Sequence, residues 1–141
     1  MNNRQVLNTE SIVECLREHG IQPSAQRVAV ADFVLQTEEH PTAERVLSEV
    51  QQSFPMISRA TVYNTLHLFV ERGLLREVKL STSSIVYDAN TDRHHHLIDE
   101  ATGEIHDIPW ETVTVDRVHE IEGFEVHEYQ VVFKGRRETT H

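Results

Sequence analysis

The sequence predicts an α+β protein, with a helical N-terminal half followed by a smaller half built from strands. Four segments before residue 74 repeat apolar residues at helical spacing, two short β-prone runs follow them, and the C-terminal part contains further strand-like runs. A chain of 141 residues is long enough for one compact domain or two small ones. We expect two domains, residues 1–87 and residues 88–141.

Each of the four predicted helices has an apolar face and a recognisable start or stop. Gly20 ends the first helix, and the short polar side chains of Ser24, Thr42 and Ser58 are the expected N-caps of the others. The predicted spans are about 10–19, 24–37, 42–52 and 58–72. The residues expected to face inward are Ile12, Cys15, Leu16, His19, Val30, Phe33, Val34, Ala43, Val46, Leu47, Val50, Val62, Leu66 and Phe69.

The outer face of the fourth helix carries groups suited to reading DNA. It offers a methyl group, a phenol, an amide and an imidazole that would lie near base edges in a major groove, with an arginine and the helix N-terminus available for phosphate. An ordinary solvent-exposed face is the other interpretation of this helix alone. The candidate DNA-binding residues are Arg59, Ala60, Tyr63, Asn64 and His67.

Two strands, about 74–80 and 84–87, follow the fourth helix and are joined by a polar turn. Helices followed by such a hairpin make a winged helix, in which the hairpin leans on phosphates beside the groove. Arg76 and Lys79 suit that role. The N-terminal half is therefore predicted to be a winged-helix DNA-binding domain.

The net charges of the two halves differ, which predicts different binding partners for them. The net charge is −10, which by itself argues against nucleic acid, but residues 1–87 hold eight basic against ten acidic residues, whereas residues 88–141 hold five against thirteen. Seven of the ten histidines also lie in the second half. The C-terminal half therefore has the composition of a cation-binding module, and the N-terminal half is free to bind DNA.

The composition also indicates the compartment and the available metal donors. No apolar run approaches the roughly 20 residues that cross a bilayer, and the N-terminus lacks the apolar segment of a secretory signal, so we expect a cytoplasmic protein without membrane contact. A single cysteine, Cys15, makes neither an internal disulfide nor a cysteine-rich zinc site. Any metal must therefore be held by nitrogen and oxygen donors.

Residues 88–107 have the pattern of a metal site assembled from short strands. His94 and His96 are two positions apart, so their imidazoles would share one face of a strand while His95 points to the other. Asp88 and Asp107 flank them as oxygen donors. A glycine at 103 permits the turn that brings Asp107 back beside the histidines. A polar hairpin with a chance histidine run is the alternative.

The remaining chain predicts a small α/β dimerisation unit. Residues 111–122 combine β-branched residues with helical spacing, and we predict a helix there, with a strand as the alternative. Residues 124–134 alternate apolar and polar side chains and predict the last strand. A short sheet with one helix exposes much edge, which favours pairing with a second copy of the chain.

With these residues assigned, the chain resembles the ferric uptake regulator (Fur) superfamily of metal-responsive transcription regulators over nearly its whole length. That resemblance implies a winged helix that binds palindromic double-stranded operator DNA, a dimerising C-terminal domain, and a regulatory site for Fe²⁺ or Mn²⁺, with Zn²⁺ able to occupy it in vitro. The matching runs are GIQPSAQR (20–27), HPTA (40–43), SRATVYNTL (58–66), ERGLL (71–75), YD (87–88), HHHLI (94–98) and GEIHD (103–107).

The family's regulatory ligands fall here on His40, Asp88, His94, His96 and Asp107, so the resemblance adds His40 to the four residues grouped by spacing. Two departures matter. Asp99 and Thr102 stand where many members have the first cysteine pair of a structural zinc site, and the C-terminal tail lacks the second pair, so no structural cysteine zinc is expected. Asn64 stands where many members have arginine.

Two branches of the superfamily compete. Cysteine-poor peroxide regulators share the two aspartates, and in them Fe²⁺ directs oxidation onto a ligand histidine, here His40 or His94. Iron response regulators, which respond to iron or haem, share the triple histidine and the residue type at Asn64. We favour a peroxide-sensing repressor.

A non-haem iron enzyme is the alternative from another class, although 141 residues in two modules leave little room for a substrate pocket. The metal held in the cell, the target promoters and a second metal site at His95, Glu111, His119 or His127 stay open.

Overall fold

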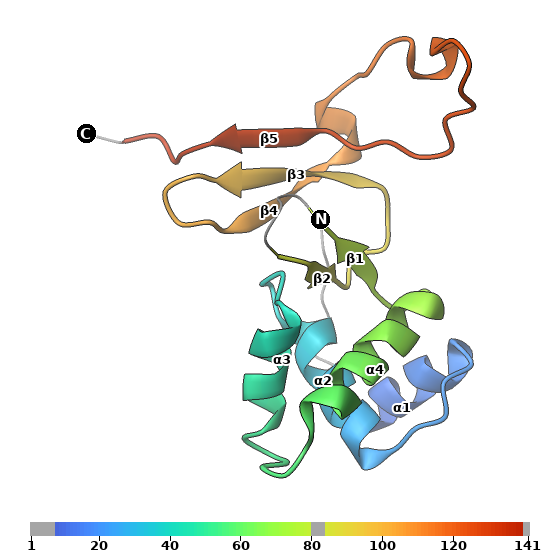
Figure 1. Ribbon diagram of the computed structural model, residues 1–141, viewed down its shortest axis with the longest axis vertical. Coiled ribbons are helices and arrows are strands. Elements are labelled where there is room, and N and C mark those ends of the chain that lie inside the picture. Colours follow the sequence, from blue (N-terminus) through green and yellow to red (C-terminus); the bar gives the residue numbers. More distant parts are fainter. Residues whose placement is uncertain (1–7, 80–83, 140–141) are drawn as a thin grey trace. The chain divides into compact units, whose positions relative to one another are not determined.

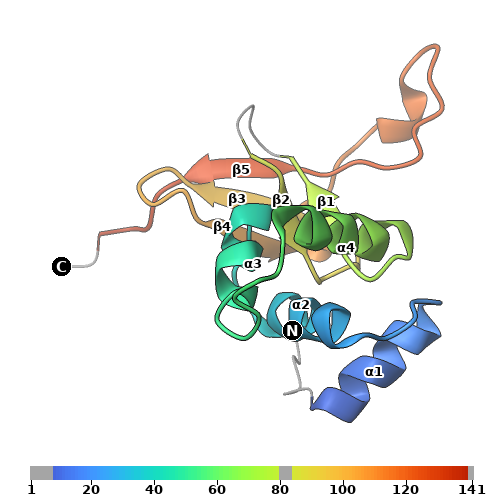
Figure 2. The ribbon, with the colours of Figure 1, turned by 60° about the horizontal axis from the view of Figure 1, so that its bottom comes forward.

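The computed structural model describes residues 8–79 and 84–139, which belong to two compact units, Met1–Thr91 and Asp92–His141. Among the described residues, the first unit contains four helices and a two-stranded hairpin, and the second contains a three-stranded sheet (Figures 1 and 2). This is the expected α+β class. None of the helices within the described ranges is long and apolar enough to cross a membrane.

The helices of the first unit begin at side-chain caps. Helices α1 (Thr9–Glu18), α2 (Ala25–Gln36), α3 (Ala43–Val50) and α4 (Arg59–Glu71) lie within about two residues of the predicted spans. Ser24, Thr42 and Ser58 each accept a hydrogen bond from the backbone N–H three residues later, as predicted. Asn8 does the same for α1, and this cap was not predicted.

The core of the first unit is formed where the apolar faces of its helices meet. Helix α4 contributes Val62, Leu66 and Phe69, all fully buried. Its opposite face is left to solvent, which matches the two-faced pattern predicted for this helix. The other buried apolar residues of this core are Ile12, Leu16, Ile21, Val30, Ala31, Val34, Ala43, Val46, Leu47, Val50, Ile57, Leu74 and Leu75.

The hairpin that follows α4 is shorter than the sequence predicts. Strand β1 spans Arg76–Val78 and pairs antiparallel with β2, Val86–Asp88. Leu74 and Leu75, predicted as strand residues, lie in the helical core instead, because burying two leucines outweighs extending an exposed ribbon. The predicted strand's last residue, Leu80, and most of the turn lie outside the described residues.

The second unit is a mixed sheet with β3 at its centre. Strand β3 (His94–Asp99) pairs antiparallel with β4 (Ile105–Pro109) and parallel with β5 (Val132–Gly135), giving the order β4-β3-β5 (Figure 1). The turn between β3 and β4 passes through Gly103, whose φ of 78° is unfavourable for other residues. The predicted turn that returns Asp107 to the histidines is therefore present.

Two predictions for the second unit are wrong. Residues 111–122 form no α-helix: they contain only the short 3₁₀ turns η1 (Trp110–Thr112) and η2 (Val118–Glu120), and Arg117 between them has a φ of 62°. The predicted strand 124–134 is a strand only from Val132 onward. The β-branched run Val113, Thr114 and Val115 lowers the helix propensity of the first segment. In the second segment, alternation creates a strand only where a partner is available, and β3 pairs with β5 only through residues 96–99.

Candidate metal centre

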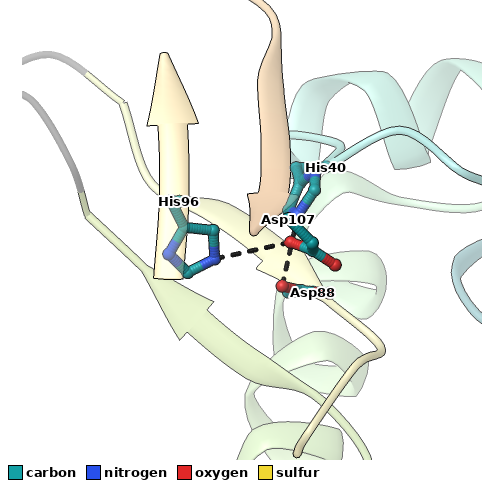
Figure 3. Close-up of side chains that lie close together, drawn as sticks. All are labelled: His40, Asp88, His96 and Asp107. Atoms are coloured by element: carbon teal, nitrogen blue, oxygen red, sulfur yellow. Dashed lines mark hydrogen bonds and ion pairs between the residues drawn. The ribbon is translucent and has the colours of Figure 1, made fainter. Parts of the chain in front are cut away.

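The first unit holds two of the predicted ligands side by side. The backbone N–H of Tyr87 donates to the Pro41 carbonyl at 2.9 Å, and Thr42 bridges to Val86, so the segment before α3 runs along strand β2. This pairing brings His40 Nε2 to 3.2 Å from Asp88 Oδ2 (Figure 3). The side chains are 4% and 1% exposed, so this carboxylate is almost completely removed from water.

A buried carboxylate is costly unless cations or donors surround it. Asp88 accepts a hydrogen bond from the backbone N–H of Asn90 at 2.9 Å as well as lying against the His40 ring. An imidazole and a carboxylate held together in this way supply one nitrogen and one oxygen donor. The pair fits the requirements of a divalent cation better than those of an apolar core.

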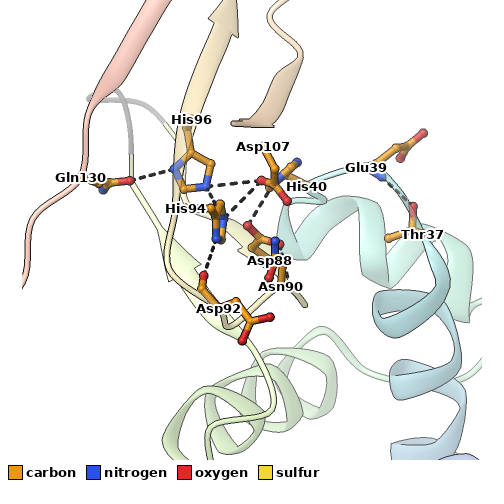
Figure 4. A network of polar contacts seen from close by, with 10 residues as sticks. All are labelled: Thr37, Glu39, His40, Asp88, Asn90, Asp92, His94, His96, Asp107 and Gln130. Atoms are coloured by element: carbon orange, nitrogen blue, oxygen red, sulfur yellow. Dashed lines mark hydrogen bonds and ion pairs between the residues drawn. The ribbon is translucent and has the colours of Figure 1, made fainter. Parts of the chain in front are cut away.

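The second unit holds the other three predicted ligands. His94 and His96 project from the same face of β3 (Figure 4). Asp107 is the direct cross-strand neighbour of His96 on β4 (Figure 3). The Asp107 Oδ1 atom lies 3.3 Å from His94 Nε2 and 3.6 Å from His96 Nε2. Both histidines are buried, whereas Asp107 is partly exposed.

The two ring nitrogens are spaced as if to share a cation. His94 Nε2 lies 3.1 Å from His96 Nε2. Two nitrogens bound to one cation at about 2.1 Å each, at right angles, would lie about 3 Å apart. The alternation predicted from the sequence therefore produces a convergent pair of donors.

The outer contacts of these histidines set their tautomers. His94 Nδ1 donates to the Asp92 carbonyl at 2.6 Å, and His96 Nδ1 donates to Gln130 Oε1 at 2.7 Å (Figure 4). Both partners are oxygen acceptors, so each Nδ1 carries the proton in the neutral ring and each Nε2 keeps its lone pair. The donor set fits a divalent metal on this ground, because a histidine that binds metal through Nε2 must carry its proton on Nδ1.

Gln130 was not identified by sequence reasoning. It lies in the irregular segment before β5 and reaches His96 across 34 positions of sequence. Nothing in its neighbours distinguishes it from an ordinary exposed glutamine. His40 was likewise invisible to the spacing argument and entered only through the family resemblance.

His95 lies on the other face of β3, as predicted. Its ring stacks on Trp110 with centroids 4.6 Å apart, and its Nδ1 accepts a hydrogen bond from the Val131 N–H at 2.9 Å. Within the described ranges, the groups of three or more candidate ligands include neither His95 nor Glu111, His119 or His127. The structure therefore gives no support to a second metal site at these residues.

The candidate DNA-binding residues all lie exposed on α4. Two of them contact an acidic residue of α3: Tyr63 donates its hydroxyl to Glu44 Oε1 at 2.8 Å, and the Arg59 guanidinium forms an ion pair with the same oxygen. His67 lies 3.4 Å from Glu71. The apolar residues behind this face anchor α4 in the core, so its outer side chains are presented on a rigid element.

Comparisons with known proteins identify the family. The model of the ferric uptake regulator family matches residues 18–134. The peroxide-responsive repressor PerR of Staphylococcus aureus strain Mu50 is 36% identical over 101 residues, which make up 72% of this chain and 68% of that protein.

Solved structures share the whole architecture. A zinc-bound manganese uptake regulator superposes with a TM-score of 0.71 at 25% identity, covering 90% of this chain and 98% of that one. PerR from Streptococcus pyogenes is 30% identical with a TM-score of 0.52, covering 97% and 96% of the two chains. The resemblance inferred from the sequence motifs is confirmed, and the winged-helix and dimerisation-domain architecture is that of these regulators. The chain belongs to the ferric uptake regulator family.

Proposed function

We propose that this protein is a metal-dependent, homodimeric DNA-binding repressor that responds to peroxide. The observation that carries the proposal is the pair of Nε2 lone pairs on His94 and His96, 3.1 Å apart, with both Nδ1 protons committed to oxygen acceptors. Histidines that serve only in a core or on a surface are not required to direct two Nε2 lone pairs at one point. It is what a regulatory cation requires.

The regulatory cation would be Fe²⁺ or Mn²⁺ held by His40, Asp88, His94, His96 and Asp107. Three imidazoles and two carboxylates are borderline and hard donors that suit these metals, and Zn²⁺ would also bind such a set in vitro. The two carboxylates would balance the charge of a divalent cation. The chain's only cysteine, Cys15, lies in α1, so the proposal includes no structural cysteine zinc.

The donors come from both compact units, and this gives the metal its regulatory effect. A cation that engages His40 and Asp88 of the first unit together with the histidines of the second favours one relative arrangement of the two units. The same arrangement would let two copies of α4 meet the two halves of a palindromic operator. By linkage, operator DNA and the cation then strengthen each other's binding.

Peroxide sensing follows from the chemistry of the donors and from the named relatives. Bound Fe²⁺ would activate peroxide, so that one peroxide oxygen is added to a ring carbon of a neighbouring imidazole, the ring loses two electrons, and the other oxygen leaves as water. His40 and His94 are the candidates. An added oxygen on either ring weakens its Nε2 as a donor, so metal affinity falls and the coupling to DNA is lost. This is regulation by a single modification of the chain, and no catalytic turnover is required.

The test exposes the anaerobically prepared Fe²⁺ and Mn²⁺ forms to low peroxide and maps the oxidised peptides by mass spectrometry. We expect one added oxygen on His40 or His94 in the Fe²⁺ form only, with a parallel loss of affinity for operator DNA. Asp107→Asn should abolish both responses, and Asp116→Asn, the same change at an exposed aspartate, should preserve them. Unmodified histidines together with a response to haem would assign the protein to the iron-response branch. Sustained turnover of an organic substrate would identify an enzyme.

A further inference from the structure

We infer that Glu44 is a specificity-determining residue of the DNA-binding face, which screens Arg59 from DNA phosphates and orients Tyr63. The inference rests on the proposed DNA-binding function. Glu44 lies in the first turn of α3, and its Oε1 contacts both Tyr63 and Arg59, which are one helical turn apart on the exposed face of α4. One carboxylate oxygen therefore joins two of the five candidate DNA-binding residues.

All three side chains are accessible to an approaching duplex. Glu44 and Arg59 are more than half exposed, and Tyr63 is 41% exposed. Glu44 and Tyr63 also line a recess of about 580 Å³ together with Lys79 of the hairpin. The contact is a surface feature on the face proposed to dock on DNA, so it is not part of the packing that holds the unit together.

The first consequence concerns charge. Non-specific DNA binding depends almost entirely on cations that neutralise phosphates, and each such contact adds about 0.9 to the slope of log affinity against log salt. Arg59 is the only lysine or arginine among the five candidates, and its guanidinium is already paired with Glu44. A phosphate that approaches Arg59 must displace this carboxylate or tolerate its repulsion. Glu44 therefore weakens binding to sequences that offer phosphates alone.

The second consequence concerns the Tyr63 hydroxyl. Because its proton is donated to Glu44, the phenol oxygen presents only lone pairs to the DNA. In the major groove it would then accept from the amino groups of adenine or cytosine and would not donate to guanine or thymine. The same carboxylate thus penalises non-specific contacts and restricts which base edges Tyr63 can read, which is how specificity is gained at the expense of raw affinity.

The test measures DNA affinity of the Mn²⁺-loaded dimer over a salt series. Two duplexes of equal length and composition are used: one selected from a random pool by the parent protein with Mn²⁺, and one shuffled. Glu44→Gln keeps an oxygen acceptor for Tyr63 and removes the charge. Glu49→Gln is the matched control, because it removes the same charge from the same helix but contacts Arg45 instead of α4.

We expect Glu44→Gln to bind the shuffled duplex about tenfold more tightly at about 0.1 M salt and to steepen its salt slope by about 0.9. The selected duplex should gain less, so the specificity ratio falls. Glu49→Gln should keep the parent's slope and ratio. In an Arg59→Ala background, Glu44→Gln should no longer steepen the slope, which a merely structural role of Glu44 would not predict.

A salt slope and specificity ratio in Glu44→Gln equal to those of Glu49→Gln would overturn the inference while leaving the proposed function intact. A parent protein that binds neither duplex, with or without Mn²⁺, would overturn the DNA-binding function and the role of Glu44 with it. The two failures are distinguishable because the second appears before any variant is made.

Discussion

At the scale of single residues, the positions of protons decide what the candidate metal centre can do. His94 and His96 each donate Nδ1–H to an oxygen and keep a lone pair on Nε2. A backbone carbonyl accepts the Nδ1 proton of the first ring, whereas a side chain, Gln130, accepts that of the second. A mutation of Gln130 should therefore change the metal affinity of His96 although Gln130 is not itself a candidate ligand.

Truncation of that side chain gives the first prediction. Gln130→Ala should lower Mn²⁺ affinity about 10–100-fold, because the His96 ring loses the contact that fixes its tautomer and orientation. The free energy of unfolding should change little, since Gln130 is exposed. Isothermal titration with Mn²⁺ measures the effect, and Gln52→Ala, the same truncation at an exposed glutamine of the first unit, is the control. Parent-like affinity in Gln130→Ala would show that the His96 ring keeps its orientation without Gln130.

At the scale of elements, the buried face of helix α4 stabilises the first unit, and its exposed face carries the candidate DNA-binding residues. Phe69→Ala should destabilise the first unit by about 3–5 kcal/mol, because a fully buried ring is replaced by a cavity. Tyr63→Ala should leave the unfolding free energy nearly unchanged and weaken operator binding by about 1–3 kcal/mol. Chemical unfolding and DNA-binding titrations of the same two variants check this. Equal stability losses in both would mean that the exposed face also holds the fold.

The turn between β3 and β4 is held by Asp99. The pKa of this carboxyl lies below its usual value, chiefly because the Ala101 backbone N–H donates to it, with help from Thr102 and from Arg137. Arg137 lies 3.9 Å from Asp99 and 3.8 Å from Glu104. A guanidinium thus links the turn to the segment after β5.

This turn predicts an acid-sensitive contribution to stability. A carboxyl with a lowered folded-state pKa stabilises the fold above its unfolded value of about 3.9, and the contribution is lost as the pH falls through the folded value. Asp99→Asn should therefore be less stable than the parent at neutral pH, and the difference should shrink below about pH 4. Urea unfolding at neutral and acidic pH measures it. Asp116→Asn, the same change at an exposed aspartate, is the control.

The predictability of each element depended on how local its determinants are. Helices starting at Ser24, Thr42 and Ser58 were predicted because each cap lies within three residues of the N–H it satisfies. Residues 111–122 were mispredicted because helical spacing was given more weight than their β-branched run at 113–115. Residues 124–131 were mispredicted because their structure depends on how much of β3 remains to be paired. Local pattern cannot report that quantity.

The candidate site follows the same rule. The convergence of His94 and His96 is a property of one strand and could be predicted from alternation alone. His40 and Asp88 meet across 48 positions through pairing of an irregular segment with β2, and no local pattern encodes that contact. Only the resemblance to known regulators supplied it.

At the scale of the whole molecule, folding and metal binding should be separable. The apolar core of the first unit contains none of the five candidate ligands, and in the second unit backbone pairing of β3 with both neighbours holds the sheet. Removal of metal with EDTA should therefore leave a folded dimer and abolish operator binding. Circular dichroism, sedimentation and DNA titration of one chelated sample test this. Unfolding on chelation would indicate a structural metal.

The pairing of His40 with Asp88 inside one unit, and of His94 and His96 with Asp107 inside the other, also bears on the entropy of metal binding. Five donors scattered over 68 positions of sequence would be expensive to gather one by one. Here each group is already assembled by its own unit, and Asp88 and His94 are only six positions apart along the chain. The proposed cation would bind two groups of donors that are already formed. The conformational entropy lost on binding would then come mainly from the short connector, Ala89 to Arg93.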